Sequence, residues 1–194
     1  MFNIIEKNLL FFNSINFYSK TFPIYKAIIF MNDLTLYIPK TFMYQTFNFL
    51  HKHSNTQYKI LSDIAGKDLP NQSLRFEVIY NLLSIFYNNR LSIKIKVNET
   101  TQLPSITSIF TSANWWEREL WDMFGISFTN HPDLRRILTD YGFQGHPLRK
   151  DFPLTGFFEI RYNERLKRIT MDFLELSKEY HIHSFKLNLN TFVA

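Results

Sequence analysis

The sequence predicts an α+β fold: a mainly antiparallel sheet with a helix packed on one face, followed by a turn-rich, extended C-terminal segment. Residues 75–87 and 91–97 alternate apolar and polar side chains, as strands with one buried face do. Residues 41–50 instead place apolar side chains at helical spacing. Beyond Pro104 these regular patterns give way to clustered glycines and prolines, which favour turns.

The first part of the chain is expected to hold a pair of strands and a helix. Residues 1–22 show no convincing period and are assigned to an N-terminal arm or a short helix. Residues 27–30 and 34–38 are apolar runs that flank the turn signal Met31-Asn32-Asp33. The helix at residues 41–50 then has one apolar face, formed by Phe42, Met43, Thr46, Phe47 and Leu50.

Three more strands complete the predicted sheet. Residues 58–64 place Ile60 and Ile64 at even spacing, so both side chains are expected on one face. The Asn88-Asn89 pair indicates a turn between the next two strands, because asparagine tolerates the left-handed conformation. The side chains expected to face the core from these two strands, residues 75–87 and 91–97, are Phe76, Val78, Tyr80, Leu82, Leu91, Ile93, Ile95 and Val97.

A second helix is predicted over residues 115–124. Asn114 and Glu117 are expected to form a capping box at its start, and Arg118 to pair with Asp122 one turn later. We therefore expect a helix cap and surface ion pairs made by Asn114, Glu117, Arg118 and Asp122. The apolar stripe is formed by Trp116, Leu120, Met123 and Phe124.

The segment that follows is expected to be ordered by a partner, because it has many turns and few regular runs. Gly125 suits the left-handed residue that ends a helix. We divide the chain into an N-terminal arm (1–22), an α+β domain (23–126), a turn-rich partner-binding extension (127–168) and a C-terminal tail (169–194). The predicted contact residues, each with an internal contact as the alternative, are Trp115, Trp121, Arg135, Arg136, His146, Arg149, Lys150, Asp151 and Phe152.

Composition and missing motifs exclude several kinds of site. The chain has no cysteine, so disulfides, zinc–thiolate sites and Cys-ligated iron–sulfur clusters are impossible. It also has no Gly-rich phosphate loop, nucleophile elbow or His-Glu-x-x-His motif. We predict no catalytic, cofactor-binding or metal-ligating residue. The net charge of +5 suits an acidic protein, an anionic lipid or a nucleic acid, but no run of five like charges occurs.

Residues 113–126, Ala-Asn-Trp-Trp-Glu-Arg-Glu-Leu-Trp-Asp-Met-Phe-Gly-Ile, resemble the signature helix of the 30-kDa subunit family of respiratory complex I. The resemblance covers roughly residues 33–162, although Gln144 stands where the family often has glutamate. The family's common Pro-Trp near the C-terminus is also missing. The other segments that fit the family are residues 75–84, 104–108, 131–142 and 143–154.

This resemblance implies a non-catalytic core subunit of the peripheral arm of NADH:ubiquinone oxidoreductase, which supports assembly and the quinone-reduction module. The implied partners are other complex I subunits, chiefly the 49-kDa quinone-site subunit and the subunit with the terminal iron–sulfur cluster. No cofactor is expected in this chain, because FMN and the iron–sulfur clusters belong to other subunits. No nucleic acid is expected as a partner.

The expected location is the matrix side of the mitochondrial inner membrane, with membrane association only through the complex. The abundant Phe, Tyr, Ile, Asn and Lys use codons rich in A and T, and the N-terminus does not resemble a transit peptide. Both observations favour synthesis from a mitochondrial genome, with a bacterial origin as the alternative. The alternative function is a basic RNA-binding mitochondrial ribosomal protein, but acidic and basic residues mix closely in residues 133–151.

Overall fold

A computed structural model describes residues 14–30 and 33–178 of the chain. Its contacts divide the chain into unit 1, Met1–Phe152, and unit 2, Pro153–Ala194. Unit 1 therefore includes residues 127–152, which the sequence analysis assigned to the extension. Among the described residues, no helix is long and apolar enough to cross a membrane.

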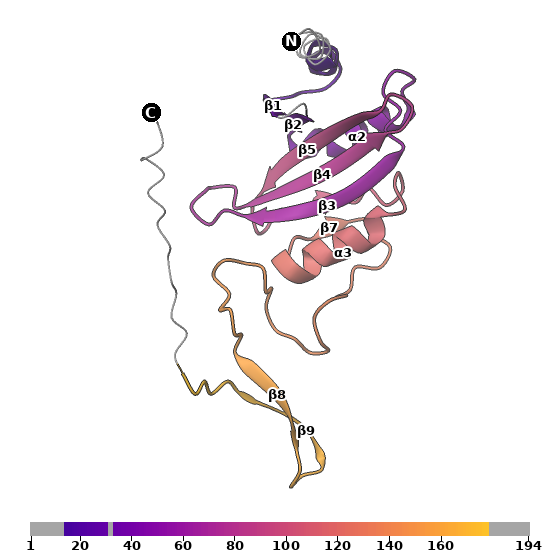
Figure 1. Cartoon of the computed structure of the whole chain (residues 1–194). Helices are drawn as coiled ribbons and strands as arrows, with labels where there is room; N and C mark the ends of the chain where they lie inside the picture. The colour runs from indigo at the N-terminus through magenta and orange to yellow at the C-terminus, as the bar shows by residue number, and fades with distance from the viewer. Residues whose placement is uncertain (1–13, 31–32, 179–194) are drawn as a thin grey trace, which may run out of the picture. The chain divides into compact units, whose positions relative to one another are not determined.

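Unit 1 is built around a five-stranded mixed sheet with the strand order β1-β2-β5-β4-β3 (Figure 1). Neighbouring strands are antiparallel except β2 and β5, which are parallel. The α+β class and the mainly antiparallel pairing expected from the sequence are therefore confirmed. The strands are β1 (Lys26–Phe30), β2 (Asp33–Tyr37), β3 (Ile60–Asp68), β4 (Phe76–Ser84) and β5 (Asn89–Val97).

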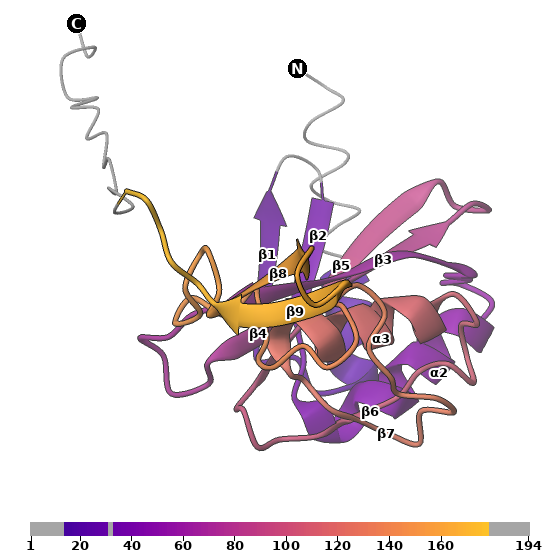
Figure 2. The same cartoon turned by 90° about the horizontal axis from the view of Figure 1, so that it is seen from below.

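Helices α2 (Met43–Lys52) and α3 (Ala113–Phe124) lie on the same side of this sheet (Figures 1 and 2). The ring of Phe47 in α2 lies 4.9 Å from that of Tyr80, and the ring of Phe124 in α3 lies 6.3 Å from that of Phe76. Tyr80 and Phe76 lie four positions apart on β4, so their side chains point to the same face of the sheet. The alternating apolar residues predicted for β4 and β5 are all buried beneath the helices.

Shorter elements connect these parts of unit 1. Residues 14–21 are helical, the 3-10 helix η1 (Lys40–Phe42) leads into α2, and residues 1–13 of the predicted arm lie outside the described residues. Strands β6 (Leu103–Pro104) and β7 (Phe128–Thr129) form a short parallel pair before and after α3. This pairing brings the two ends of the α3 segment together.

Two predicted positions differ from the structure. Phe42 belongs to η1 and is 41% exposed, so the buried face of α2 is Met43, Thr46, Phe47 and Leu50. Ile60 is 37% exposed whereas Ile64 is buried. The register shifts between Leu61 and Asp63, and an irregularity of this kind breaks the strict alternation of faces along a strand. The turn predicted at Asn88-Asn89 lies at residues 85–88, so the strand predicted to reach residue 87 ends at Ser84 and Asn89 already begins β5. Asn88 has the expected positive φ, 46°.

Unit 2 contains an antiparallel hairpin of β8 (Phe158–Asn163) and β9 (Arg168–Phe173). Lys167, in the connection between the strands, has a positive φ of 50°. The described residues of this unit that follow the hairpin are irregular up to residue 178.

Candidate functional site

Helix α3 ends as the sequence predicts but begins differently. Gly125 has a φ of +78°, and its N–H donates to the carbonyls of Leu120 and Trp121. The N-cap is Ser112, which makes no side-chain capping bond, and Asn114 lies inside the helix. The predicted capping box is therefore wrong. The helix begins two residues earlier than predicted, at Ala113, whose N–H donates to the Phe110 carbonyl.

Glu117 is a buried carboxylate rather than a capping group. It is 0% exposed, and it accepts hydrogen bonds from the Ser105 hydroxyl at 2.6 Å and the Ile106 backbone N–H at 2.9 Å. His131 lies near it, with 3.8 Å between Nε2 and a carboxylate oxygen. Burial raises the pKa of Glu117 to about 7, because the two hydrogen bonds offset only part of the lost hydration. Glu117 thus ties α3 to the strand β6 region.

Asp122 holds the loop that follows α3. The Asp122 carboxylate is 0% exposed and accepts from three consecutive backbone N–H groups, those of residues 137, 138 and 139, at 3.2, 2.8 and 2.9 Å. The Thr139 hydroxyl donates at 2.7 Å and Arg136 Nη1 at 3.1 Å. Burial alone would raise the pKa of Asp122, but these donors outweigh it and lower the pKa to about 2.

The predicted surface pair between Arg118 and Asp122 is wrong. Arg118 is buried, and its guanidinium donates to the backbone carbonyls of Arg135 and Arg136 at 3.2 and 3.4 Å. Both side chains bond to the loop because its backbone polar groups lie in no helix or sheet and need partners. Arg118 supplies donors to the loop's carbonyls, while Asp122 supplies an acceptor for its N–H groups.

A second anchor joins the end of unit 1 to the sheet. Asp68 in β3 accepts from Arg75 at 2.7 and 2.9 Å and from the Lys150 backbone N–H at 2.7 Å. Arg75 also pairs with Asp151 at 2.9 Å and with Glu99. The hydrogen bond from Arg75 keeps the pKa of Asp68 below its usual value, and the same partner lowers the pKa of Asp151. This anchor connects residues 82 positions apart in the chain.

Arg149 and His146 pack against the end of α3. Arg149 Nε donates to the Phe124 carbonyl at 2.7 Å, and His146 Nδ1 lies 2.9 Å from the Asp122 carbonyl. A Cβ on Gly125 would approach both side chains to 2.5–2.7 Å. Glycine is therefore required here both for its positive φ and for the space it leaves.

The structure separates the predicted contact residues into two groups. Trp115 is 68% exposed, and the side chains of Arg135 and Asp151 are 72% and 62% exposed. Lys150 is also exposed. The remaining residues are at least partly buried: Trp121, Arg136, His146, Arg149 and Phe152. Among them, the ring of Trp121 contacts that of His146, and His146 and Arg149 both lie against Gly125. Whether any of the nine contacts a partner stays a prediction.

The hairpin of unit 2 has an apolar face that the sequence analysis missed. The paired positions Phe158–Phe173, Ile160–Met171 and Tyr162–Ile169 all lie on this face. Every one of these six side chains is between 41% and 77% exposed. The opposite face carries charged and polar residues such as Glu159, Asp172 and Arg161. The strict alternation of residues 158–162 and 169–173 could have revealed this hairpin.

Comparison with known proteins assigns a family to these features. Residues 36–158 match the family described as "Respiratory-chain NADH dehydrogenase, 30 Kd subunit". The chain is 51% identical over 168 residues to NADH-ubiquinone oxidoreductase subunit 9 of Reclinomonas americana, covering 86% of this chain and 82% of the relative. It is 52% identical over 144 residues to NADH dehydrogenase [ubiquinone] iron-sulfur protein 3 of Arabidopsis thaliana, covering 74% of this chain and 76% of the relative.

A solved structure shares the fold at much lower identity. A chain of the membrane-bound sulfane sulfur reductase, an archaeal respiratory membrane complex, superposes with a TM-score of 0.63 at 18% identity. The match covers 73% of this chain and 85% of the other. At this identity the likeness shows only that the two chains have a common fold.

Proposed function

This chain belongs to the family of the 30-kDa subunit of respiratory-chain NADH dehydrogenase, and from that premise we propose that it is a non-catalytic core subunit of the peripheral arm of NADH:ubiquinone oxidoreductase. The observation that carries the proposal is the identity of about half of all residues over most of both chains. In this role the chain supports assembly and the quinone-reduction module, while NADH-to-quinone electron transfer coupled to proton translocation belongs to the whole complex.

The chain itself is proposed to bind no cofactor, with FMN and iron–sulfur clusters held by other subunits. Its 194 residues include no cysteine, so it lacks the thiolates that hold most protein clusters. The described residues also contain no group of three or more His, Asp or Glu side chains placed to hold a metal ion. The name "iron-sulfur protein 3" of its relatives therefore does not require a cluster in this chain.

Its partners are proposed to be other subunits of the same complex, chiefly the 49-kDa quinone-site subunit and the subunit with the terminal cluster. The hairpin of unit 2 supports a large protein contact. Two-stranded hairpins are marginally stable alone, and this one exposes six large apolar side chains on one face. Covering that face with another subunit would stabilise the hairpin and remove the apolar surface from water.

The mitochondrial relatives support a mitochondrial location for the complex. We place the chain on the matrix side of the inner membrane, peripheral and attached through its partner subunits. The ribosomal alternative receives no support, since the relatives described above are named as subunits of the oxidoreductase.

Native gel electrophoresis of detergent-solubilised membranes tests the proposal. The chain should migrate in the band that stains for NADH dehydrogenase activity, together with the other peripheral-arm subunits. The purified chain alone should show no NADH oxidation and no flavin or cluster absorbance. A chain found only in particles rich in RNA, or one that retains stoichiometric flavin or iron, would contradict the proposal.

A further inference from the structure

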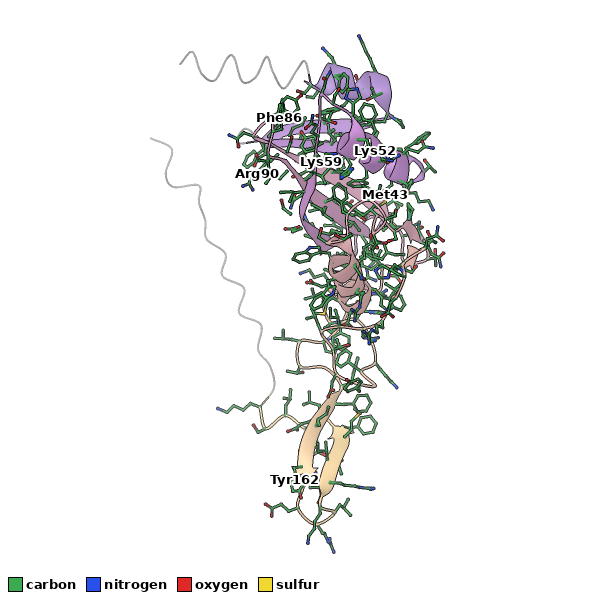
Figure 3. The ribbon with its side chains drawn as sticks, turned by 90° about the vertical axis from the view of Figure 1, so that its right-hand side faces the viewer. Met43, Lys52, Lys59, Phe86, Arg90 and Tyr162 are labelled. Atoms are coloured by element: carbon green, nitrogen blue, oxygen red, sulfur yellow. The ribbon has the colours of Figure 1, made fainter. Side chains whose placement is uncertain are left out.

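At one end of unit 1, residues 52–59 lie against the turn between β4 and β5, and together they carry cationic and exposed apolar side chains. Tyr87 Oη, in the turn between β4 and β5, donates to the Ser54 carbonyl at 2.9 Å. Asn89 Nδ2 donates to Tyr58 Oη at 3.2 Å. Figure 3 shows Lys52, Lys59, Phe86 and Arg90 at this end of the unit. We define the basic tip as Lys52, Lys59, Ile85, Phe86, Tyr87 and Arg90.

The positive charge of the basic tip exceeds the negative charge in its surroundings. Residues 34–62 and 78–98 contain no aspartate or glutamate. Of the two aspartates that border these ranges, Asp33 lies beside Arg90, because Leu34 pairs with Leu91, and Asp63 accepts a hydrogen bond from Asn81. Within the part of the chain that the structure describes, Lys52, Lys59 and Arg90 have no carboxylate at ion-pair distance. Burial lowers the pKa of neighbouring His51, and the charges of Lys59 and Lys52 lower it further. The tip therefore has a local positive potential.

The same tip exposes apolar side chains in fixed positions. Ile85 is 69% exposed and Phe86 is 74% exposed, while Tyr87 is 46% exposed. The rings of Phe86 and Tyr87 are 4.9 Å apart in an edge-to-face arrangement. Tyr87 is held by its bond to Ser54, so the turn presents Phe86 on an ordered backbone. Aromatic side chains and arginine are enriched in protein interfaces and often supply most of the binding energy.

We propose that the basic tip docks an acidic segment of a neighbouring subunit, with carboxylates facing Lys52 and Lys59 and an apolar pocket that takes Phe86. The inference rests on the proposed function, since it assigns a further partner surface to the same subunit. Charge complementarity identifies the occupant, because an apolar centre flanked by Lys52 and Lys59 favours an anionic partner with an apolar site. A folded subunit matches the ordered turn better than a fluid lipid surface does.

The absence of cysteine from the chain provides a direct test. In Phe86→Cys, the introduced residue is the only thiol of this chain, and its modification by a maleimide can be followed by mass spectrometry. We expect at least about tenfold slower modification in the isolated native complex than in the free full-length chain, because a partner covers the position. Equal rates would overturn the docking proposal alone, whereas absence of the chain from the NADH-oxidising particle would overturn the proposed function. Protection that is lost when lipid is removed would assign the tip to a lipid surface and also refute the docking proposal.

The charge requirement is tested by reversing two lysines. Lys52→Glu with Lys59→Glu should weaken retention of one neighbouring subunit by about tenfold or more, because like charges then face each other. The control, Lys40→Glu with Lys67→Glu, makes the same change in net charge at two exposed lysines outside the tip. Carbodiimide cross-linking of the unmodified complex should join Lys52 or Lys59 to an aspartate or glutamate of another subunit. Equal retention in both double variants would refute the proposal.

Discussion

Replacing Asp122 by asparagine should release the loop of residues 136–139 from helix α3. In the folded chain one carboxylate oxygen accepts the three backbone N–H groups, and the other accepts from Arg136 and Thr139. An amide has only one oxygen, so Asp122→Asn must direct its NH2 group either at the backbone N–H groups or at Arg136. Some of these donors lose their acceptor in both orientations. We expect a loss of about 2 kcal/mol in the free energy of unfolding.

The lowered pKa of Asp122 predicts a similar loss of stability and makes that loss depend on pH. A carboxyl with a pKa of 3.8 when unfolded and about 2 when folded stabilises the native state by about 2 kcal/mol at neutral pH. Because the folded pKa is depressed, this stabilisation is complete above the unfolded pKa and is lost as the pH falls through the folded pKa. The difference in stability between the wild type and Asp122→Asn should therefore be constant from pH 5 to 7 and shrink between about pH 4 and pH 2.

Urea unfolding as a function of pH measures this difference, and hydrogen exchange locates it. The amides of residues 137–139 should lose protection in Asp122→Asn, while the amides of β4 and β5 keep theirs. Asp133→Asn is the matched control: its side chain is 58% exposed and pairs with exposed Arg135, so it should cost about 0–1 kcal/mol. Unchanged protection at residues 137–139, or a stability difference that does not depend on pH, would refute this account of Asp122.

Three further changes test other parts of the structure. Glu117→Gln should be as stable as the wild type near pH 4 and more stable at pH 8, by on the order of 3 kcal/mol at most, because the wild type is destabilised as the pH rises from 4.5, the unfolded pKa of Glu117, through about 7, its folded pKa. Urea unfolding at both pH values measures this difference, and equal pH dependence in the two proteins would contradict it. Gly125→Ala should lower the thermal midpoint of unfolding more than Gly142→Ala does. Both glycines have a positive φ, but of the two only Gly125 has side chains where a Cβ would lie. Similar midpoints for the two variants would show that space at Gly125 is unimportant. Ile160→Asp on the apolar face of the hairpin should reduce the amount of native complex, whereas Thr170→Asp on the opposite face should not. Blue-native gels measure the amount of complex in both variants, and normal assembly of the Ile160 variant would show that this face is not an interface.

Much of the sheet could be predicted because strand alternation is a local property. The inward residues of β4 and β5 follow every second position, and all of those predicted are buried. The left-handed end of α3 at Gly125 is likewise a local prediction, because a residue that ends a helix in the left-handed conformation is usually glycine. The β3 irregularity could not be predicted in this way, because a register shift depends on the pairing with β4 and not on β3 alone.

The polar residues of α3 show where sequence reasoning failed. Spacing along a helix predicts partners three or four residues away, which led to the expected capping box and the Arg118–Asp122 pair. The observed donors to Asp122 are 14 to 17 residues further along the chain, and those to Glu117 are 11 and 12 residues before it. No local pattern announces such distant partners.

The sequence by itself determined the family, the α+β class and the buried face of the sheet, since motifs and alternation can be read from neighbouring residues. Only the tertiary structure decided that Glu117, Arg118 and Asp122 are buried. These side chains satisfy backbone N–H and C=O groups of loops that have no regular secondary structure of their own. The reason is that a buried polar backbone group must find a partner, and which side chain serves it depends on how the chain folds back in space.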